Sequence, residues 1–257
     1  MIQLFLLSTG LVVLAIAIAI LLKKFIKTEK GIFILFLVAG FLTVVVHYSS
    51  LLFHLIKDGE CLTFLTSNPN LILPIYPCNV VMICCLIIGV TPNKNTRILR
   101  YLIDFSVLFG AVSALVGMYV NVDFFNNPTL GDYDVTKGIV AHAAMFFNIV
   151  LLFVFGYFKL DLIKNMIRFL VAVVMMAIIG LYDSAVILAF AGKETMMNIN
   201  PMFMLHSPFE GAGFLMFPFI AGVAILLLFI VLIVAEAIKY RKDKEHIWYR
   251  RLQTKHS

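Results

Sequence analysis

Charged residues are scarce in this chain. Of its 257 residues, 13% are Asp, Glu, Lys or Arg, whereas 62% are hydrophobic, and the mean hydropathy is +1.03. That composition lies well outside the range of soluble domains. The chain also lacks a repeat of about 20–50 residues and a low-complexity tract, which argues against a repeat protein or a long disordered linker. The sequence therefore predicts an integral membrane protein.

Three further absences narrow the class of protein. The alternating pattern typical of membrane strands is missing, so the apolar runs are predicted to be helices. No His–Cys cluster has the spacing of a zinc site, and haem would need paired axial ligands on facing helices, so no metal or cofactor is expected. Basic residues form no separate patch, so no nucleic-acid partner is expected.

Seven apolar stretches are present, each near the ~20 residues that a helix needs to cross ~30 Å of hydrocarbon. They lie at residues 2–22, 32–55, 71–90, 98–120, 139–158, 168–190 and 214–237. We therefore predict an all-α, multi-pass protein of the cell membrane, a bundle of seven transmembrane helices. Residues 1–238 form the transmembrane domain, and residues 239–257 form a basic tail.

Lys and Arg residues are distributed unevenly between the two sides of the predicted bundle. All but three of the 20 lie in the first, third and fifth loops and in the tail, and the exceptions are Lys57, Lys137 and Lys193. Because cytoplasmic loops carry the excess of basic residues, the N-terminus is predicted to be outside and the C-terminus cytoplasmic. No basic residue precedes the first apolar run, which is therefore interpreted as a retained helix and not as a signal peptide.

Reactive and hydrogen-bonding side chains gather in the outer half of the predicted bundle, within roughly 12 Å of the boundary when counted at ~1.5 Å per residue. They are Cys78, His142, His47, His54, Tyr76, Asn79, Tyr182 and Asp183. Polar groups inside hydrocarbon are costly and usually mark function. We therefore expect a site there, with Cys78 and His142 as its reactive pair and the other six as supporting or substrate-binding residues.

Cys78 has three interpretations. Pro77 is favoured in the first turn of a helix, and in that position it would place Cys78 beside free N–H groups that favour the nucleophilic thiolate. The second interpretation is a packed core thiol. The third is a disulfide with Cys61, which we expect not to form because Cys61 lies in an outer loop and Cys78 below the membrane boundary.

His142 stands among alanines, which allow close approach of a neighbouring helix and leave room around the imidazole. A lone membrane histidine often only bridges helices, but a depth close to that of Cys78 makes His142 a candidate general base. His47 or Asp183 could orient the ring, and Asn79 could stabilise an oxyanion. Asp183 is equally interpretable as a buried structural acid.

The motif "LPIYPCN", the "AH" pair in the fifth span and "YDSAVILAF…NINPMFMLHSPFEGAGF" before the last span together resemble the YwaF-like family of bacterial integral membrane proteins. They also look like the animal relatives of that family, transmembrane acyltransferases that remodel ether phospholipids. The resemblance implies a seven-helix bundle in which the motif cysteine and the fifth-helix histidine form the active centre. These residues map to Cys78 and His142, and Asn79 stands where the animal relatives have a second histidine.

The leading hypothesis is an enzyme, a membrane-embedded thiol acyltransferase or lipid hydrolase that acts on phospholipid acyl esters through Cys78 and His142. The expected partners are membrane lipids, with phospholipid and lysophospholipid as substrates. The alternative is a substrate-binding or transport protein that uses the same outer cavity.

Overall fold

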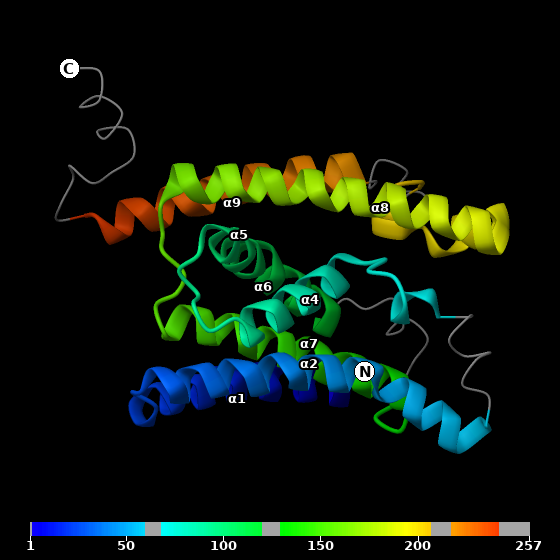
Figure 1. The fold of residues 1–257 in the computed structure, drawn as a ribbon, viewed down its shortest axis with the longest axis horizontal. Helices are drawn as coiled ribbons and strands as arrows, with labels where there is room; N and C mark the ends of the chain where they lie inside the picture. The colour runs from blue at the N-terminus through cyan, green and yellow to red at the C-terminus, as the bar shows by residue number, and fades with distance from the viewer. Residues whose placement is uncertain (1, 60–67, 120–128, 207–216, 242–257) are drawn as a thin grey trace. The chain divides into compact units, whose positions relative to one another are not determined.

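The computed structural model describes residues 2–59, 68–119, 129–206 and 217–241, and every regular element in these ranges is helical (Figure 1). The elements are α1 (Ile2–Phe25), α2 (Glu29–Asp58), η1 (Pro69–Leu71), α4 (Pro77–Val90), α5 (Arg97–Phe105), η2 (Ser106–Gly110), α6 (Ala111–Tyr119), α7 (Tyr133–Val154), α8 (Leu162–Ile199), η4 (Pro201–Phe203) and α9 (Phe217–Lys239). The predicted all-α class is thus confirmed for the described residues.

Six of the described helical segments are long and apolar enough to cross a membrane. They are Ile2–Phe25, Glu29–Lys57, Arg97–Tyr119, Tyr133–Val154, Leu162–Ile199 and Phe217–Lys239. The remaining apolar helix, α4, has 14 residues, so it rises only about 21 Å. Because that is less than the ~30 Å hydrocarbon core, the seventh crossing and the orientation of the termini stay predictions.

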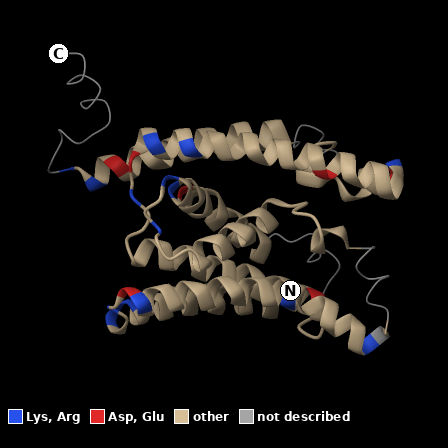
Figure 2. Ribbon diagram, viewed as in Figure 1, with Lys and Arg blue, Asp and Glu red and all other residues tan. Residues whose placement is uncertain are grey.

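Most charged residues lie near the helix ends, and the central stretches of the long helices contain few of them (Figure 2). Two acids lie well inside the spans of the described residues: Asp183 in the middle of α8, and the buried Asp104 about two turns inside the span Arg97–Tyr119. Helix α7 begins at Tyr133 and not at residue 139, where its apolar run begins, because polar residues of its first turns have partners on α2. Hydropathy alone does not predict a helix start that consists of polar residues.

The chain divides into two compact units, Met1–Tyr157 and Phe158–Ser257, each described here by itself. The first contains α1 to α7, and the second contains α8, η4 and α9. Most of the predicted basic tail lies outside the described residues, as does Cys61.

In the first unit, α2 and α4 pack with their backbones in direct contact. A Cβ added to Gly89 of α4 would lie 2.6 Å from the carbonyl oxygen of Phe36, and one added to Gly40 of α2 would lie 2.9 Å from that of Cys85. Small residues allow such close approach between membrane helices. The contact holds α4, which carries Cys78, firmly against α2.

The span Arg97–Tyr119 contains the π-helical turn Ser106–Gly110 between α5 and α6. Gly110 ends this turn, and a Cβ added to it would lie 2.7 Å from Val81 of α4 and 3.0 Å from Ile149 of α7. A π-turn changes the register of the side chains that follow it. At this joint, formed by Val81, Gly110 and Ile149, helices α4 and α7 contact the span Arg97–Tyr119.

Lys94 closes the C-terminal end of α4. It is 2% exposed, its Nζ donates to the carbonyl oxygens of Ile88 and Thr91, both at 3.0 Å, and Nζ lies 4.9 Å from the centroid of the Phe36 ring. Burial lowers the pKa of Lys94 to about 8, because desolvation disfavours the charged amine. A neutral amine still donates both hydrogen bonds, so this cap of α4 does not require the charge.

The second unit is built on α8, whose backbone leaves the helical conformation at Gly192, with a φ of 82°. The short turn η4 packs on α8 at Gly180, where an added Cβ would lie 2.8 Å from the Cβ of Met202. Met202 and Phe203 have φ values of 51° and 56°, which are uncommon for residues other than glycine. The turn η4, whose backbone is strained, therefore packs where Gly180 has no side chain.

Candidate functional site

The sequence around Cys78 forms a helix start. Pro77 is the first residue of α4, and Tyr76 precedes it with the extended φ and ψ of −112° and 154°. The Oδ1 atom of Asn79 accepts a hydrogen bond from the Tyr76 N–H at 3.0 Å, and Asn79 is 4% exposed. Asn79 and Tyr76 thus fix where the helix begins, which is a structural explanation for two of the predicted supporting residues.

Cys78 is the second residue of α4 and a free, partly buried thiol. The backbone N–H groups of Cys78 and Asn79 face its sulfur. Cys84 and Cys85, on the following turns, are also free thiols and are buried among core side chains. Cys78 is therefore the cysteine of α4 whose sulfur lies at the amide-rich end of the helix.

The ring of His142 is held by α7 and α6. Its Nδ1 lies 2.8 Å from the carbonyl oxygen of Gly138, and because a carbonyl only accepts, Nδ1 carries the proton of that bond. In the neutral ring, Nε2 is then the nitrogen with a free lone pair. The ring packs on Gly117 of α6, where an added Cβ would overlap it. Gly117 was not among the residues predicted from the sequence, since a lone glycine in an apolar helix has no distinctive pattern.

Cys78 and His142 lie on the same side of the joint formed by Val81, Gly110 and Ile149. Cys78 is one turn from Val81 towards the start of α4, and His142 is two turns from Ile149 towards the start of α7. Counted along the helices, His142 lies about 6 Å nearer the membrane boundary than Cys78. No hydrogen bond joins Cys78 to a histidine in the part of the chain that the structure describes, and their action as a pair stays a prediction.

His54 has a partner on α7. Its Nε2 lies 3.0 Å from Oδ2 of Asp134, and one residue away the rings of Phe53 and Tyr133 stack with centroids 3.9 Å apart. The hydroxyl of Tyr133 also donates to Oγ of Ser49 at 2.7 Å. These contacts join the end of α2 to the start of α7, so His54 has a structural explanation.

His47 differs from His54, because its buried Nε2 has no hydrogen-bond partner among the described residues. Its ring interacts electrostatically with His142 and with Lys137. Of the predicted supporting residues in the first unit, His47 is the one with an electrostatic interaction with His142.

Tyr182 and Asp183 belong to the second unit. Tyr182 is 63% exposed, whereas Asp183 is fully buried, and neither of its carboxylate oxygens has a hydrogen-bond partner within the described ranges. The next residue, Ser184, donates its hydroxyl to the Gly180 carbonyl oxygen at 2.7 Å. The contribution of Tyr182 and Asp183 to a site with Cys78 stays a prediction.

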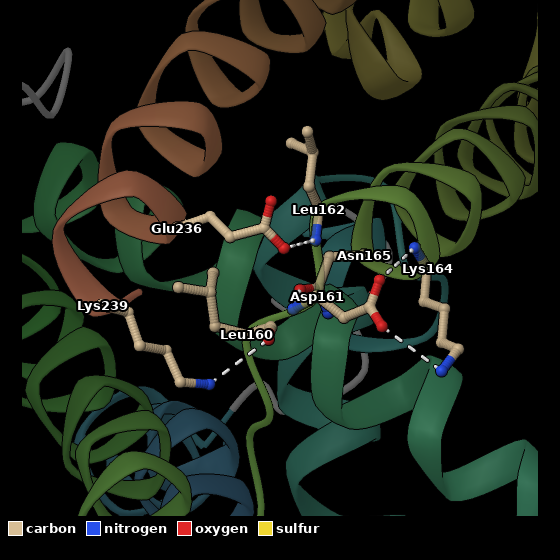
Figure 3. Close-up of polar contacts among 7 residues, drawn as sticks. All are labelled: Leu160, Asp161, Leu162, Lys164, Asn165, Glu236 and Lys239. Atoms are coloured by element: carbon tan, nitrogen blue, oxygen red, sulfur yellow. Dashed lines mark hydrogen bonds and ion pairs between the residues drawn. The ribbon is translucent and has the colours of Figure 1, made fainter. Parts of the chain in front are cut away.

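A polar network in the second unit joins the start of α8 to the end of α9 (Figure 3). Asp161 accepts a hydrogen bond from the Lys164 N–H at 3.2 Å, and its own N–H donates to Oδ1 of Asn165 at 2.7 Å. The fully buried Glu236 of α9 accepts from the Leu162 N–H at 3.5 Å. Carboxylates are stabilised at helix N-termini, so this network ties the two helices together.

The composition and the helices long enough to cross a bilayer define a multi-pass integral membrane protein. No cluster of three or more His, Cys, Asp or Glu side chains suited to a metal ion occurs among the residues described. The sequence profile described as the TMEM164 family matches residues 1–250, and the chain therefore belongs to the TMEM164 family. No curated protein and no solved structure matches the chain.

Proposed function

We propose that this protein is a membrane thiol acyltransferase or lipid hydrolase acting on the acyl esters of phospholipids, the activity implied by the resemblance of its motifs. The observation that carries the proposal is the position of Cys78, a free thiol at the second residue of α4 with two backbone N–H groups facing its sulfur. Backbone N–H groups in such a position can stabilise the oxyanion that forms when the sulfur attacks a carbonyl.

His142 supplies the proton acceptor in the proposed reaction. Its Nε2 takes the proton of the Cys78 thiol, the sulfur bonds to the ester carbonyl carbon, and the ester C–O bond breaks. The departing lysolipid oxygen takes the proton back from Nε2. In the second half, water or the hydroxyl of a lysophospholipid gives its proton to Nε2 and attacks the thioester, which releases the product and restores the thiol.

Acyl transfer from a radiolabelled phospholipid by the purified protein tests the proposal. Wild type and Cys84→Ala are expected to release or transfer the acyl chain, because Cys84 is a packed core thiol on the same helix. Cys78→Ala is expected to lose activity by more than about 1000-fold, since no other group replaces the nucleophile. Equal activity of the two alanine variants would exclude Cys78 as the nucleophile.

The second candidate is a membrane protein that binds a lipid or small solute without turning it over. The unpartnered Nε2 of His47 favours it, because a buried polar atom without a partner is costly and a bound molecule would satisfy it. In the same assay this protein would retain the labelled phospholipid and leave its ester intact.

A further inference from the structure

Helices α2 and α4 keep an antiparallel register where their backbones touch. A Cβ added to Gly89 would lie 2.6 Å from the Phe36 carbonyl oxygen. A Cβ added to Gly40 would lie 2.9 Å from the Cys85 carbonyl oxygen. The two contacts are four positions apart on each helix, and the residue numbers rise along α2 as they fall along α4. One residue along α2 therefore corresponds to one residue back along α4.

This register places His47 of α2 opposite Cys78 of α4. His47 lies seven positions after Gly40, and Cys78 lies seven positions before Cys85. Because seven residues are close to two full turns, each side chain leaves its helix in nearly the same direction as at the contact. A hydrogen bond from the His47 ring to the backbone of Asn70, seven residues before the start of α4, agrees with this placement.

The Nε2 atom of His47 is a hydrogen-bond acceptor. The ring bonds to the Asn70 backbone carbonyl through Nδ1–H, because Nε2 has no partner among the described residues and a carbonyl only accepts. In the neutral ring, Nε2 then carries the lone pair. The ring of His142 has the same arrangement, with its Nδ1 bonded to the Gly138 carbonyl, and the two rings interact electrostatically.

Ser50 adds a second unpartnered atom beside His47. Its Oγ is buried without a hydrogen-bond partner in the described ranges, and the residue is 1% exposed. Ser50 lies three positions after His47, so the two side chains are neighbours on the surface of α2. A hydroxyl both donates and accepts, whereas Nε2 of His47 only accepts. Such a pair is costly in a membrane interior unless a group that offers both functions binds to it.

Water suits these atoms better than an alcohol does. A water molecule can donate one hydrogen to His47 and the other to His142 while its oxygen accepts from Ser50, which leaves one lone pair for attack. An alcohol has a single hydroxyl hydrogen and can serve only one of the two imidazoles. The thioester of the proposed reaction would form on Cys78, opposite His47, so a water held there is placed beside the carbonyl carbon.

We propose that His47 and Ser50 hold the water molecule that hydrolyses the acyl-thioester on Cys78, and that they thereby set the ratio of hydrolysis to acyl transfer. The inference rests on the proposed function, because it requires the acyl-enzyme. The water gives one proton to Nε2 of His142, its oxygen bonds to the carbonyl carbon, and the C–S bond breaks. The fatty acid leaves, and the proton passes from His142 to the sulfur. His47 and Ser50 are positioning residues.

The decay of the acyl-enzyme in detergent tests the inference. The protein is loaded briefly with radiolabelled phospholipid, separated from it, and followed with and without lysophosphatidylethanolamine. His47→Phe is expected to slow the release of free fatty acid at least about tenfold, because the attacking water loses a hydrogen bond, while transfer to the lysophospholipid keeps its wild-type rate. Ser50→Ala should slow hydrolysis with the same selectivity. His47→Gln, which retains a donor and an acceptor, should restore most of it.

His54→Phe is the matched control, since His54 lies two turns further along α2 and is paired with Asp134. This variant is expected to keep the wild-type ratio of hydrolysis to transfer. Equal losses of hydrolysis and transfer in His47→Phe, or an unchanged rate of hydrolysis, would overturn the inference. An acyl-enzyme that transfers its acyl group but is never hydrolysed would also overturn it and leave the proposed function intact. A wild type that forms no acyl-enzyme would refute the proposed function, and the inference with it.

Discussion

Replacement of Gly117 by alanine is expected to reduce acyl transfer by about 100-fold while leaving the protein folded. A Cβ at this position would overlap the ring of His142, so the ring must turn away from α6. That movement breaks the Nδ1 bond to the Gly138 carbonyl and moves Nε2 from its place. Initial rates with labelled phospholipid, measured beside the thermal unfolding midpoint, separate a misplaced base from a damaged fold.

Gly10→Ala is the control for this experiment. Gly10 is a helical glycine of α1, and a Cβ added to it would meet no atom within 4 Å. Both substitutions replace glycine with the better helix former, so neither should weaken its helix. If Gly117→Ala turned over lipid as fast as Gly10→Ala, the position of the His142 ring would be irrelevant to the activity.

Gly89→Ala is expected to destabilise the protein by about 2–3 kcal/mol, the usual cost of forcing extra volume into a packed interface. The added Cβ would lie 2.6 Å from the backbone carbonyl oxygen of Phe36, and a backbone atom cannot rotate away as a side chain does. Helices α2 and α4 must therefore separate, which disturbs the contact at Gly40 as well. The thermal midpoint of the detergent-solubilised protein measures the effect.

Gly138→Ala provides the comparison, because an alanine Cβ at this helical position has open space around it. Its midpoint should equal or slightly exceed that of the wild type, since alanine has the higher helix propensity. A Gly89→Ala protein as stable as Gly138→Ala would show that α2 and α4 are not packed backbone to backbone.

Hydropathy predicted the long helices well, because about twenty consecutive apolar residues have few alternatives to a membrane helix. The proline, and not hydropathy, suggested Pro77 as a possible first residue of a helix, since proline fits the first turn where its missing N–H is not needed. Hydropathy did not predict the shortness of α4. The residues from Leu71 to Tyr76 are apolar enough to extend the span, but they form a short turn and an extended segment before the helix begins.

The roles of the polar residues were harder to predict. Depth along a helix follows from sequence position, but the partner of a side chain depends on which helix it faces, and a single sequence does not supply that information. His54 thus pairs with Asp134, and Asn79 holds the start of α4. Lys137 was counted only for orientation, although the structure places it near His47.

The central claim is that Cys78 carries the acyl group during turnover. Its most direct test is mass spectrometry of the protein after brief exposure to phospholipid and rapid acid quenching. The account predicts a peptide containing Cys78 heavier by one acyl group, with the added mass removed by neutral hydroxylamine, as expected for a thioester. Turnover of phospholipid with no acyl group on Cys78, or with the group on another residue, would contradict it.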